Sequence, residues 1–166
     1  MKIAIYPGSF DPITSGHLNI IRRAANIFDK LVVCVMVNGA KSPMFSQQER
    51  VDMIRSVVSD IPNVEVDASA ELLAEYAKRK GGCVVVKGLR AGSDFENEFQ
   101  MALINHKINP DLDTMFLTSE HQYMYLSSST VKELGMYDVD LSDFLPEQII
   151  PAFKKRIADI HLGGER

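Results

Sequence analysis

The chain has 166 residues, of which 46% are hydrophobic and 24% are charged. This length suits one domain, and the apolar content supplies a core that needs neither a metal nor a disulfide. Since 22 acidic residues outnumber 18 basic ones, the net charge is −4. Proteins that bind nucleic acid over a broad surface are usually basic, so we expect no nucleic-acid partner. A local basic pocket for a phosphorylated small molecule stays open.

The chain has two cysteines, Cys34 and Cys83. Two are too few for a disulfide scaffold or a cysteine-based zinc cluster. Each lies in an apolar, β-branched run, so we expect reduced cysteines buried in strands. No apolar run reaches the roughly 18 residues of a membrane span, and the first six residues lack the plan of a signal peptide. We therefore expect a cytoplasmic protein that does not contact a membrane.

The expected elements alternate between strands and helices. A strand over residues 2–6, ended by Pro7-Gly8, precedes a helix over 16–28. The continuous apolar run 31–37 predicts a strand covered on both faces, as in a parallel sheet. The later elements are expected as a helix from Ser46 to about Val58, a strand over 64–67, a helix over 70–80, a strand over 83–86, a helix from Ser93 to about Ile108, a strand over 114–118, a helix from Thr130 and a C-terminal helix after Pro146.

Capping-box patterns predict the starts of three helices. They are Ser46–Glu49, Ser93–Glu96 and Thr130–Glu133. Strands separated by helices imply right-handed crossovers. We therefore expect an α/β fold: a Rossmann-like open five-stranded parallel sheet with helices on both faces, in a single domain over residues 1–166.

The carboxyl ends of the strands are the expected place for a ligand in such a sheet. The first end, residues 6–17, contains neither G-x-G-x-x-G nor G-x-x-x-x-G-K-[ST], so ordinary dinucleotide binding and a P-loop are not supported. It does offer two glycines, the Ser9 hydroxyl and a histidine, His17, near a helix N-terminus. Free N–H groups there favour anions, and His17 could donate to a phosphate oxygen.

Three other strand ends carry groups that suit phosphates. Lys87 and Arg90 flank a glycine after a buried strand, and Lys41 follows strand 31–37. Hydroxyls and free N–H groups converge at Ser127–Thr130, where a helix should start. There is no G-x-S-x-G elbow, so a serine nucleophile is poorly supported.

Two short motifs resemble signatures of the nucleotidylyltransferase superfamily. Thr14-Ser15-Gly16-His17 resembles its T/H-x-G-H signature, and Ser127–Thr130 resembles its I-S-S-S/T signature. With Pro7–Pro12 and Lys87–Arg90 in this order and spacing, the whole chain resembles the bacterial phosphopantetheine adenylyltransferases. The resemblance extends to Lys41–Phe45, Glu49-Arg50, Asp94–Glu96 and Phe144–Glu147.

This resemblance implies an enzyme of coenzyme A biosynthesis, in a nucleotidylyltransferase domain. It would transfer AMP from ATP to 4′-phosphopantetheine, giving dephospho-coenzyme A and pyrophosphate. The family resemblance also implies Mg²⁺ and a homohexamer. Because the sequence shows no cluster of metal ligands, we expect Mg²⁺ to arrive on the ATP phosphates.

The resemblance also implies roles for individual residues. His17 would stabilise the transition state, Lys41 would aim the attacking phosphate, and Arg90 would receive the departing phosphates. The acceptor would be held by Ser9, Lys41, Leu73 and Lys87. ATP would be held by Ser9, Phe10, His17, Gly88, Leu89, Arg90, Glu98, Tyr123, Met124, Tyr125, Leu126, Ser127, Ser128 and Ser129.

Two positions depart from the residues usual in that family. Lys87 stands where arginine is usual, and Asn97 stands where tyrosine is frequent. Lysine keeps the charge but loses the bidentate fork of arginine. The alternatives are an adenylyl- or cytidylyltransferase of the same superfamily with another phosphorylated acceptor, a non-catalytic nucleotide-binding module and, more distantly, a sheet-edge interaction protein. The set of His17, Lys41 and Arg90 favours catalysis, because simple binding would not require it.

Overall fold

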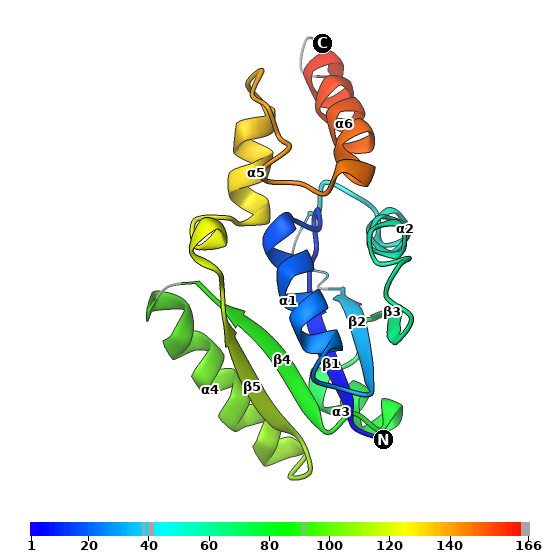
Figure 1. The fold of residues 1–166 in the computed structure, drawn as a ribbon, viewed down its shortest axis with the longest axis vertical. Helices are drawn as coiled ribbons and strands as arrows, with labels where there is room; N and C mark the ends of the chain where they lie inside the picture. Colours follow the sequence, from blue (N-terminus) through cyan, green and yellow to red (C-terminus); the bar gives the residue numbers. More distant parts are fainter. Residues whose placement is uncertain (38, 40–41, 91, 164–166) are drawn as a thin grey trace.

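The computed structural model describes residues 1–37, 39, 42–90 and 92–163. It confirms the expected Rossmann-like α/β fold, a parallel sheet in the order β3-β2-β1-β4-β5 with helices on both faces (Figure 1). The strands are β1 (Ile3–Gly8), β2 (Lys30–Met36), β3 (Val64–Ser69), β4 (Val84–Leu89) and β5 (Asp113–Thr118). The helices are α1 (Ser15–Ala25), α2 (Gln47–Val57), α3 (Leu73–Lys80), α4 (Gly92–Ile108), α5 (Ser128–Gly135) and α6 (Ile150–Gly163), with short 3-10 turns η1 (His121–Tyr123) and η2 (Glu147–Ile149).

The central strands are buried on both faces because successive residues alternate between two cores. Ala4 and Tyr6 of β1 pack in one core with residues of α1, α2, α5 and α6. Ile5 packs in the other core with residues of α3. Cys34 is buried in β2, as expected, whereas Cys83 is only partly buried and lies one residue before β4. The two-sided burial explains why the sequence of β2 is continuously apolar.

Strand β1 runs through Pro7 and Gly8, so the prediction that these residues end the strand is wrong. Its pairing with β2 continues to Gly8, but its pairing with β4 ends at Ile5. The carbonyl of Ile3 faces β4, because it accepts a hydrogen bond from Cys83 N, directly before β4, at 3.0 Å. Alternate residues of a strand present their backbone groups to the same neighbour, so Ile5 and Pro7 also face β4. Since proline has no N–H to donate, the ladder ends there and the two strands separate at their carboxyl ends.

Two of the three predicted capping boxes do not start their helices. The box at Ser46 is confirmed, because Ser46 Oγ accepts from Glu49 N at 3.2 Å and Glu49 Oε2 accepts from Ser46 N at 2.7 Å. Helix α4 begins at Gly92, before Ser93, so Ser93 is not its cap. Helix α5 is capped by Ser127, whose Oγ accepts from Thr130 N at 3.0 Å, so Thr130 lies inside the helix. The earlier serine takes the cap because it already satisfies a free N–H of the first turn.

Helix α5 packs closely on α6 at a glycine, and this contact gives a stability prediction. A Cβ at Gly135 would lie 2.5 Å from Cε1 of the buried Phe153 ring. Gly135→Ala should therefore lower the free energy of unfolding by about 1–3 kcal/mol, the usual cost of overpacking. Gly163→Ala is the control, since a Cβ there meets nothing within 4 Å. Urea denaturation should separate the two variants, and equal stabilities would contradict this packing.

Candidate active site

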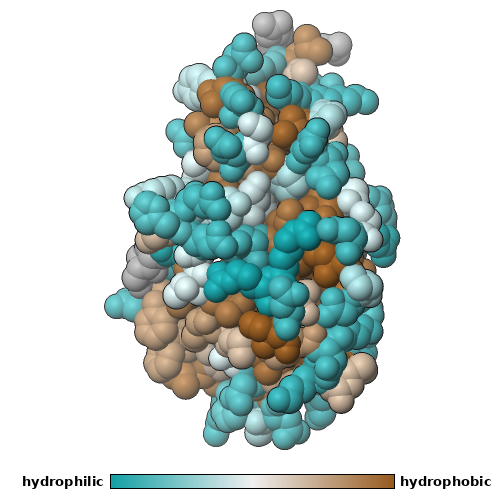
Figure 2. All heavy atoms as spheres, viewed as in Figure 1, coloured by the Kyte–Doolittle hydropathy of each residue, from teal (hydrophilic) through white to brown (hydrophobic). Residues whose placement is uncertain are grey.

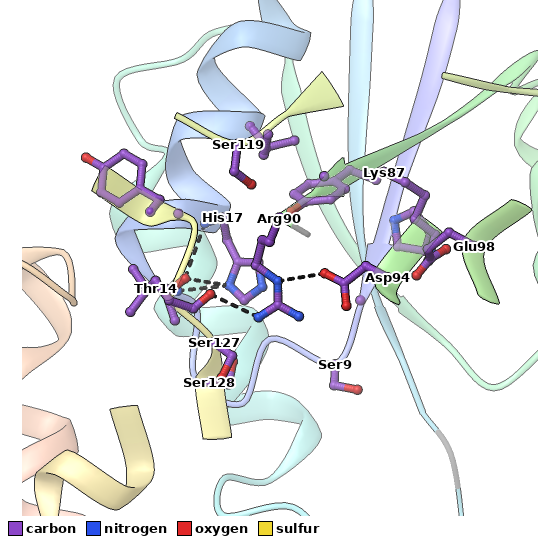
Figure 3. A pocket seen from close by; sticks show the side chains of 18 of the residues that line it. Ser9, Thr14, His17, Lys87, Arg90, Asp94, Glu98, Ser119, Ser127 and Ser128 are labelled. Atoms are coloured by element: carbon purple, nitrogen blue, oxygen red, sulfur yellow. Dashed lines mark hydrogen bonds and ion pairs between the residues drawn. The ribbon is translucent and has the colours of Figure 1, made fainter. Parts of the chain in front are cut away.

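A cavity of about 440 Å³ opens where β1 and β4 separate. In a doubly wound sheet this is the topological switch point, where ligands bind beyond the strands. Figure 3 shows the side chains that converge on it from β4, α1, α4 and the segment before α5. Its lining comprises Tyr6, Pro7, Gly8, Ser9, Thr14, Gly16, His17, Ile20, Lys87, Gly88, Arg90, Asp94, Asn97, Glu98, Ser119, Tyr123, Leu126, Ser127 and Ser128.

His17 is held by its own helix start. Thr14 caps α1, and His17 is the third helical residue, the position that glutamate takes in an ordinary capping box. Nδ1 of His17 accepts from Thr14 N at 3.0 Å (Figure 3). Because Nδ1 accepts this bond, the proton of the neutral ring is on Nε2. The ring also stacks edge-on against Phe10, with centroids 5.0 Å apart.

The imidazole of His17 is neutral at physiological pH. Burial, with a smaller contribution from the Arg90 charge, lowers the pKa of His17 from 6.5 to about 4. The site therefore has a neutral Nε2–H donor beside the N-terminus of α1, where the helix dipole favours anions. Such a donor can bind an oxygen on which negative charge develops during a reaction.

Each cation described in this cavity holds a carboxylate partner. Arg90 Nε lies 3.1 Å from Asp94 Oδ2, and Arg90 Nη1 donates to the carbonyl of Leu126 at 3.1 Å (Figure 3). Lys87 Nζ lies 3.2 Å from Glu98 Oε2. These contacts anchor both cations between β4, α4 and the segment before α5. The guanidinium of Arg90 still has donors left over for a phosphate, since it carries five N–H groups.

The serine segment offers backbone donors more than hydroxyls. Ser127 Oγ caps α5, and Ser128 Oγ donates to the carbonyl of Pro12 at 2.8 Å. Both hydroxyls therefore have protein partners. Thr130 N donates to Ser127 Oγ, which leaves the N–H groups of Ser128 and Ser129 for an anion, as at other helix N-termini.

A second cavity of about 540 Å³ lies beside the first, beyond the end of β2. The two share Ser9 and Ser128 in their walls. Arg50 is buried and donates to the carbonyl of Ser9 at 2.9 Å, and Lys132 Nζ lies 3.0 Å from Asp11 Oδ2. The sequence analysis did not single out Asp11 or Lys132 as site residues. The sequence did contain one indication for Lys132: it follows Ser129 by three residues on the same helix, which places the two on one face.

The structure brings most of the predicted site residues together, though their roles stay predictions. Ser129 lies in the second cavity, and Ser9 lies in both. Lys87 and Gly88 belong to β4 itself, where they pair with β5, and do not follow the strand. The predicted residues in the first cavity are Ser9, His17, Lys87, Gly88, Arg90, Glu98, Tyr123, Leu126, Ser127 and Ser128.

Other predicted residues lie elsewhere. Phe10 is buried beneath His17, and Leu89 ends β4 without lining either cavity as the described residues define them. Met124 and Tyr125 are exposed, and Leu73 packs on the core that contains α3. Lys41 lies outside the described residues. The cavity also includes Tyr6, Asp94 and Ser119, for which the sequence motifs predicted no role in the site.

Residues 5–134 match the family model described as cytidylyltransferase-like. The chain is 54% identical over 159 residues to a phosphopantetheine adenylyltransferase of Caldanaerobacter subterraneus subsp. tengcongensis, covering 93% of this chain and 99% of that protein. A phosphopantetheine adenylyltransferase of Alkaliphilus metalliredigens is 51% identical over 156 residues, covering 94% and 99%. Among solved structures, the Plasmodium falciparum nicotinic acid mononucleotide adenylyltransferase complexed with NaAD has a TM-score of 0.62 at 17% identity, covering 97% of this chain and 96% of that one. This last likeness is one of fold.

The state of the His17 ring can be measured directly. Nitrogen NMR of the histidine rings should show the Nε2–H form of His17, with a pKa of about 4. Since the unfolded chain takes up this proton near pH 6.5, the free energy of unfolding should fall as the pH decreases from 6.5 toward 4. His17→Gln should remove that part of the pH dependence. A pKa near 6.5, or a proton on Nδ1, would contradict the arrangement.

Proposed function

The chain belongs to the cytidylyltransferase-like family and, within it, to the phosphopantetheine adenylyltransferases, and we propose that it transfers AMP from ATP to 4′-phosphopantetheine. The products would be dephospho-coenzyme A and pyrophosphate, a step of coenzyme A biosynthesis. The observation that carries this proposal is the cluster of phosphate donors at the separation of β1 and β4, with His17 Nε2–H among them.

The reaction needs positioning and charge stabilisation. An oxygen of the acceptor's phosphate attacks the α-phosphorus of ATP, a new P–O bond forms, and the bond to the oxygen shared with the β-phosphate breaks. The electron pair leaves with pyrophosphate. Such transfers ask for little covalent chemistry from the protein, which agrees with a site built of donors. His17 Nε2–H donates to a non-bridging oxygen of the α-phosphate as charge develops there.

The other donors serve the two ends of the reaction. Arg90, anchored by Asp94 and the Leu126 carbonyl, receives the departing phosphates together with the N–H groups of α5. Lys87 meets the acceptor's phosphate as a single point of charge, steadied by Glu98. Lys41 would aim the same phosphate. The role of Lys41 rests on the resemblance of residues 41–45 to the phosphopantetheine adenylyltransferases.

The proposal includes Mg²⁺, which would enter the site bound to the phosphates of ATP. Within residues 1–37, 39, 42–90 and 92–163, no group of three or more histidine, cysteine, aspartate or glutamate side chains is placed to hold a metal ion. The acidic residues of the first cavity, Asp94 and Glu98, are paired with cations. This donor set fits an ion held mainly by phosphate oxygens, which it would neutralise.

A homohexamer is also part of the proposal, and helix α4 supports self-association. Its 17 residues leave large apolar side chains exposed, far more than a helix facing water would carry. Figure 2 shows these brown side chains gathered at the lower left, over α4. They are Phe95, Phe99, Met101, Leu103, Ile104 and Ile108.

The proposed cellular location, and the proposed lack of nucleic-acid and membrane partners, rest on the sequence. Among the described residues, no helix is long and apolar enough to cross a membrane. A cytoplasmic enzyme without nucleic-acid or membrane partners is the proposal that accompanies the activity.

Pyrophosphate release tests the proposed reaction. With ATP and Mg²⁺, the enzyme should turn over with 4′-phosphopantetheine and much more slowly with nicotinamide mononucleotide. His17→Ala should lower kcat by about 10²–10³-fold, the scale of losing one charge-stabilising donor. His161→Ala is the matched control, because His161 is exposed near the end of α6. Turnover with nicotinamide mononucleotide but not with 4′-phosphopantetheine would contradict the proposed acceptor. Full activity of His17→Ala would contradict the proposed role of His17.

Light scattering tests the role of the α4 surface in assembly. Leu103→Glu puts a charge on the exposed apolar surface and should yield smaller particles than the unmodified hexamer. Gln47→Glu, exposed on α2 and not on α4, adds the same charge and should leave the hexamer intact. A monomeric unmodified protein, or an intact hexamer in Leu103→Glu, would contradict this part of the proposal.

A further inference from the structure

Two charged side chains, Asp11 and Arg156, hold Met44 and Phe45 in the segment between β2 and α2. On the inner side, the buried carboxylate of Asp11 accepts from Met44 N at 2.8 Å and from Phe45 N at 2.9 Å. On the outer side, Arg156 of α6 donates to the carbonyl of Met44 and to the carboxylate of Glu49. The Arg156 guanidinium also lies over the Phe45 ring, 4.9 Å from its centroid.

The segment held in this way reaches the site. Ser42 and Pro43, directly before Met44 and Phe45, line the second cavity together with Ser9. Asp11 and Arg156 are charged, and both form hydrogen bonds with backbone atoms of this segment. Such charge-assisted hydrogen bonds are about twice as strong as neutral ones. The position of this cavity wall therefore depends on α6, which itself contributes no residue to the two cavities of the site in the described part of the chain.

Helix α6 lies outside the part of the chain that matches the general family. The cytidylyltransferase-like family model covers residues 5–134, whereas the phosphopantetheine adenylyltransferases match nearly the whole chain. The contact of Arg156 with Met44 and Phe45, directly after the wall residues Ser42 and Pro43, points to a part in acceptor binding.

We propose that Arg156 is a positioning residue for acceptor binding: it holds Met44 and Phe45 against Asp11 and so sets the position of the wall residues Ser42 and Pro43, which meet the acceptor. This inference rests on the proposed function, because it takes 4′-phosphopantetheine as the acceptor. Among the described residues Arg156 lines neither cavity of the site, so it would act on the acceptor through Met44 and Phe45 and leave the ATP site unchanged.

Steady-state kinetics of Arg156→Met tests the proposal. Methionine keeps an apolar stem on Phe45 and removes both donated bonds, so the KM for 4′-phosphopantetheine should rise about tenfold, the scale of one charge-assisted hydrogen bond. The KM for ATP should stay within about twofold of the unmodified value, because the ATP site is not touched. Arg156→Lys restores a charge but not the planar fork, so its KM for the acceptor should lie between the two.

Lys155→Met is the matched control. Lys155 is the neighbouring cation of the same helix, it is exposed, and it makes no hydrogen bond or ion pair with the residues that the structure describes. Its kinetics should equal those of the unmodified enzyme. An unchanged KM for the acceptor in Arg156→Met, or equal rises for both substrates, would overturn the proposal. If Arg156→Met does not fold, an unchanged KM for the acceptor in Arg156→Lys does the same.

The proposed reaction fails in a different way. In that case the unmodified enzyme itself would not turn over 4′-phosphopantetheine. The two failures are therefore told apart before any variant is measured.

Discussion

The site depends on a missing hydrogen-bond donor in the middle of the sheet. Pro7 faces β4 from the central strand and has no N–H, so β1 and β4 pair only as far as Ile5. Beyond that point β1 stays with β2 and β4 stays with β5. A proline inside a central strand would ordinarily be a defect. Here it lies at the opening that His17 and Arg90 line.

The donors around this opening are nearly neutral as a set, which fits the modest net charge of the chain. Arg90 and Lys87 each face a carboxylate, and burial keeps His17 uncharged. A neutral donor near a helix N-terminus gains strength as the phosphate oxygen becomes more negative, so it can favour the transition state over bound substrate. Carboxylate partners also fix where the cations lie, which matters more for an in-line transfer than their total charge.

Local patterns predicted most of the fold, and contacts distant in sequence account for what they missed. The Ser46 capping box depends only on residues 46–49, and it was predicted correctly. The end of β1 was missed because a turn signal, Pro7-Gly8, was overridden by pairing with β2. The cap of α5 was misplaced because three serines and a threonine compete within four residues, and only packing selects among them.

The same distinction applies to the candidate site. Sequence motifs brought His17, Arg90 and the start of α5 to attention, since each lies at a strand end or helix start. Asp11 and Lys132 are 121 residues apart, and Arg156 is 112 residues from the carbonyl that it binds. No local pattern announces such pairs, because only the fold brings the two partners together.

A crystal structure with dephospho-coenzyme A bound tests most directly whether the reacting phosphates bind in the opening beside Pro7. The phosphate attached to the adenosine should lie between β1 and β4, with an oxygen about 3 Å from His17 Nε2, the length of an ordinary N–H···O hydrogen bond. A product whose phosphates lie outside that opening, or a His17 ring that turns Nε2 away from them, would contradict the account.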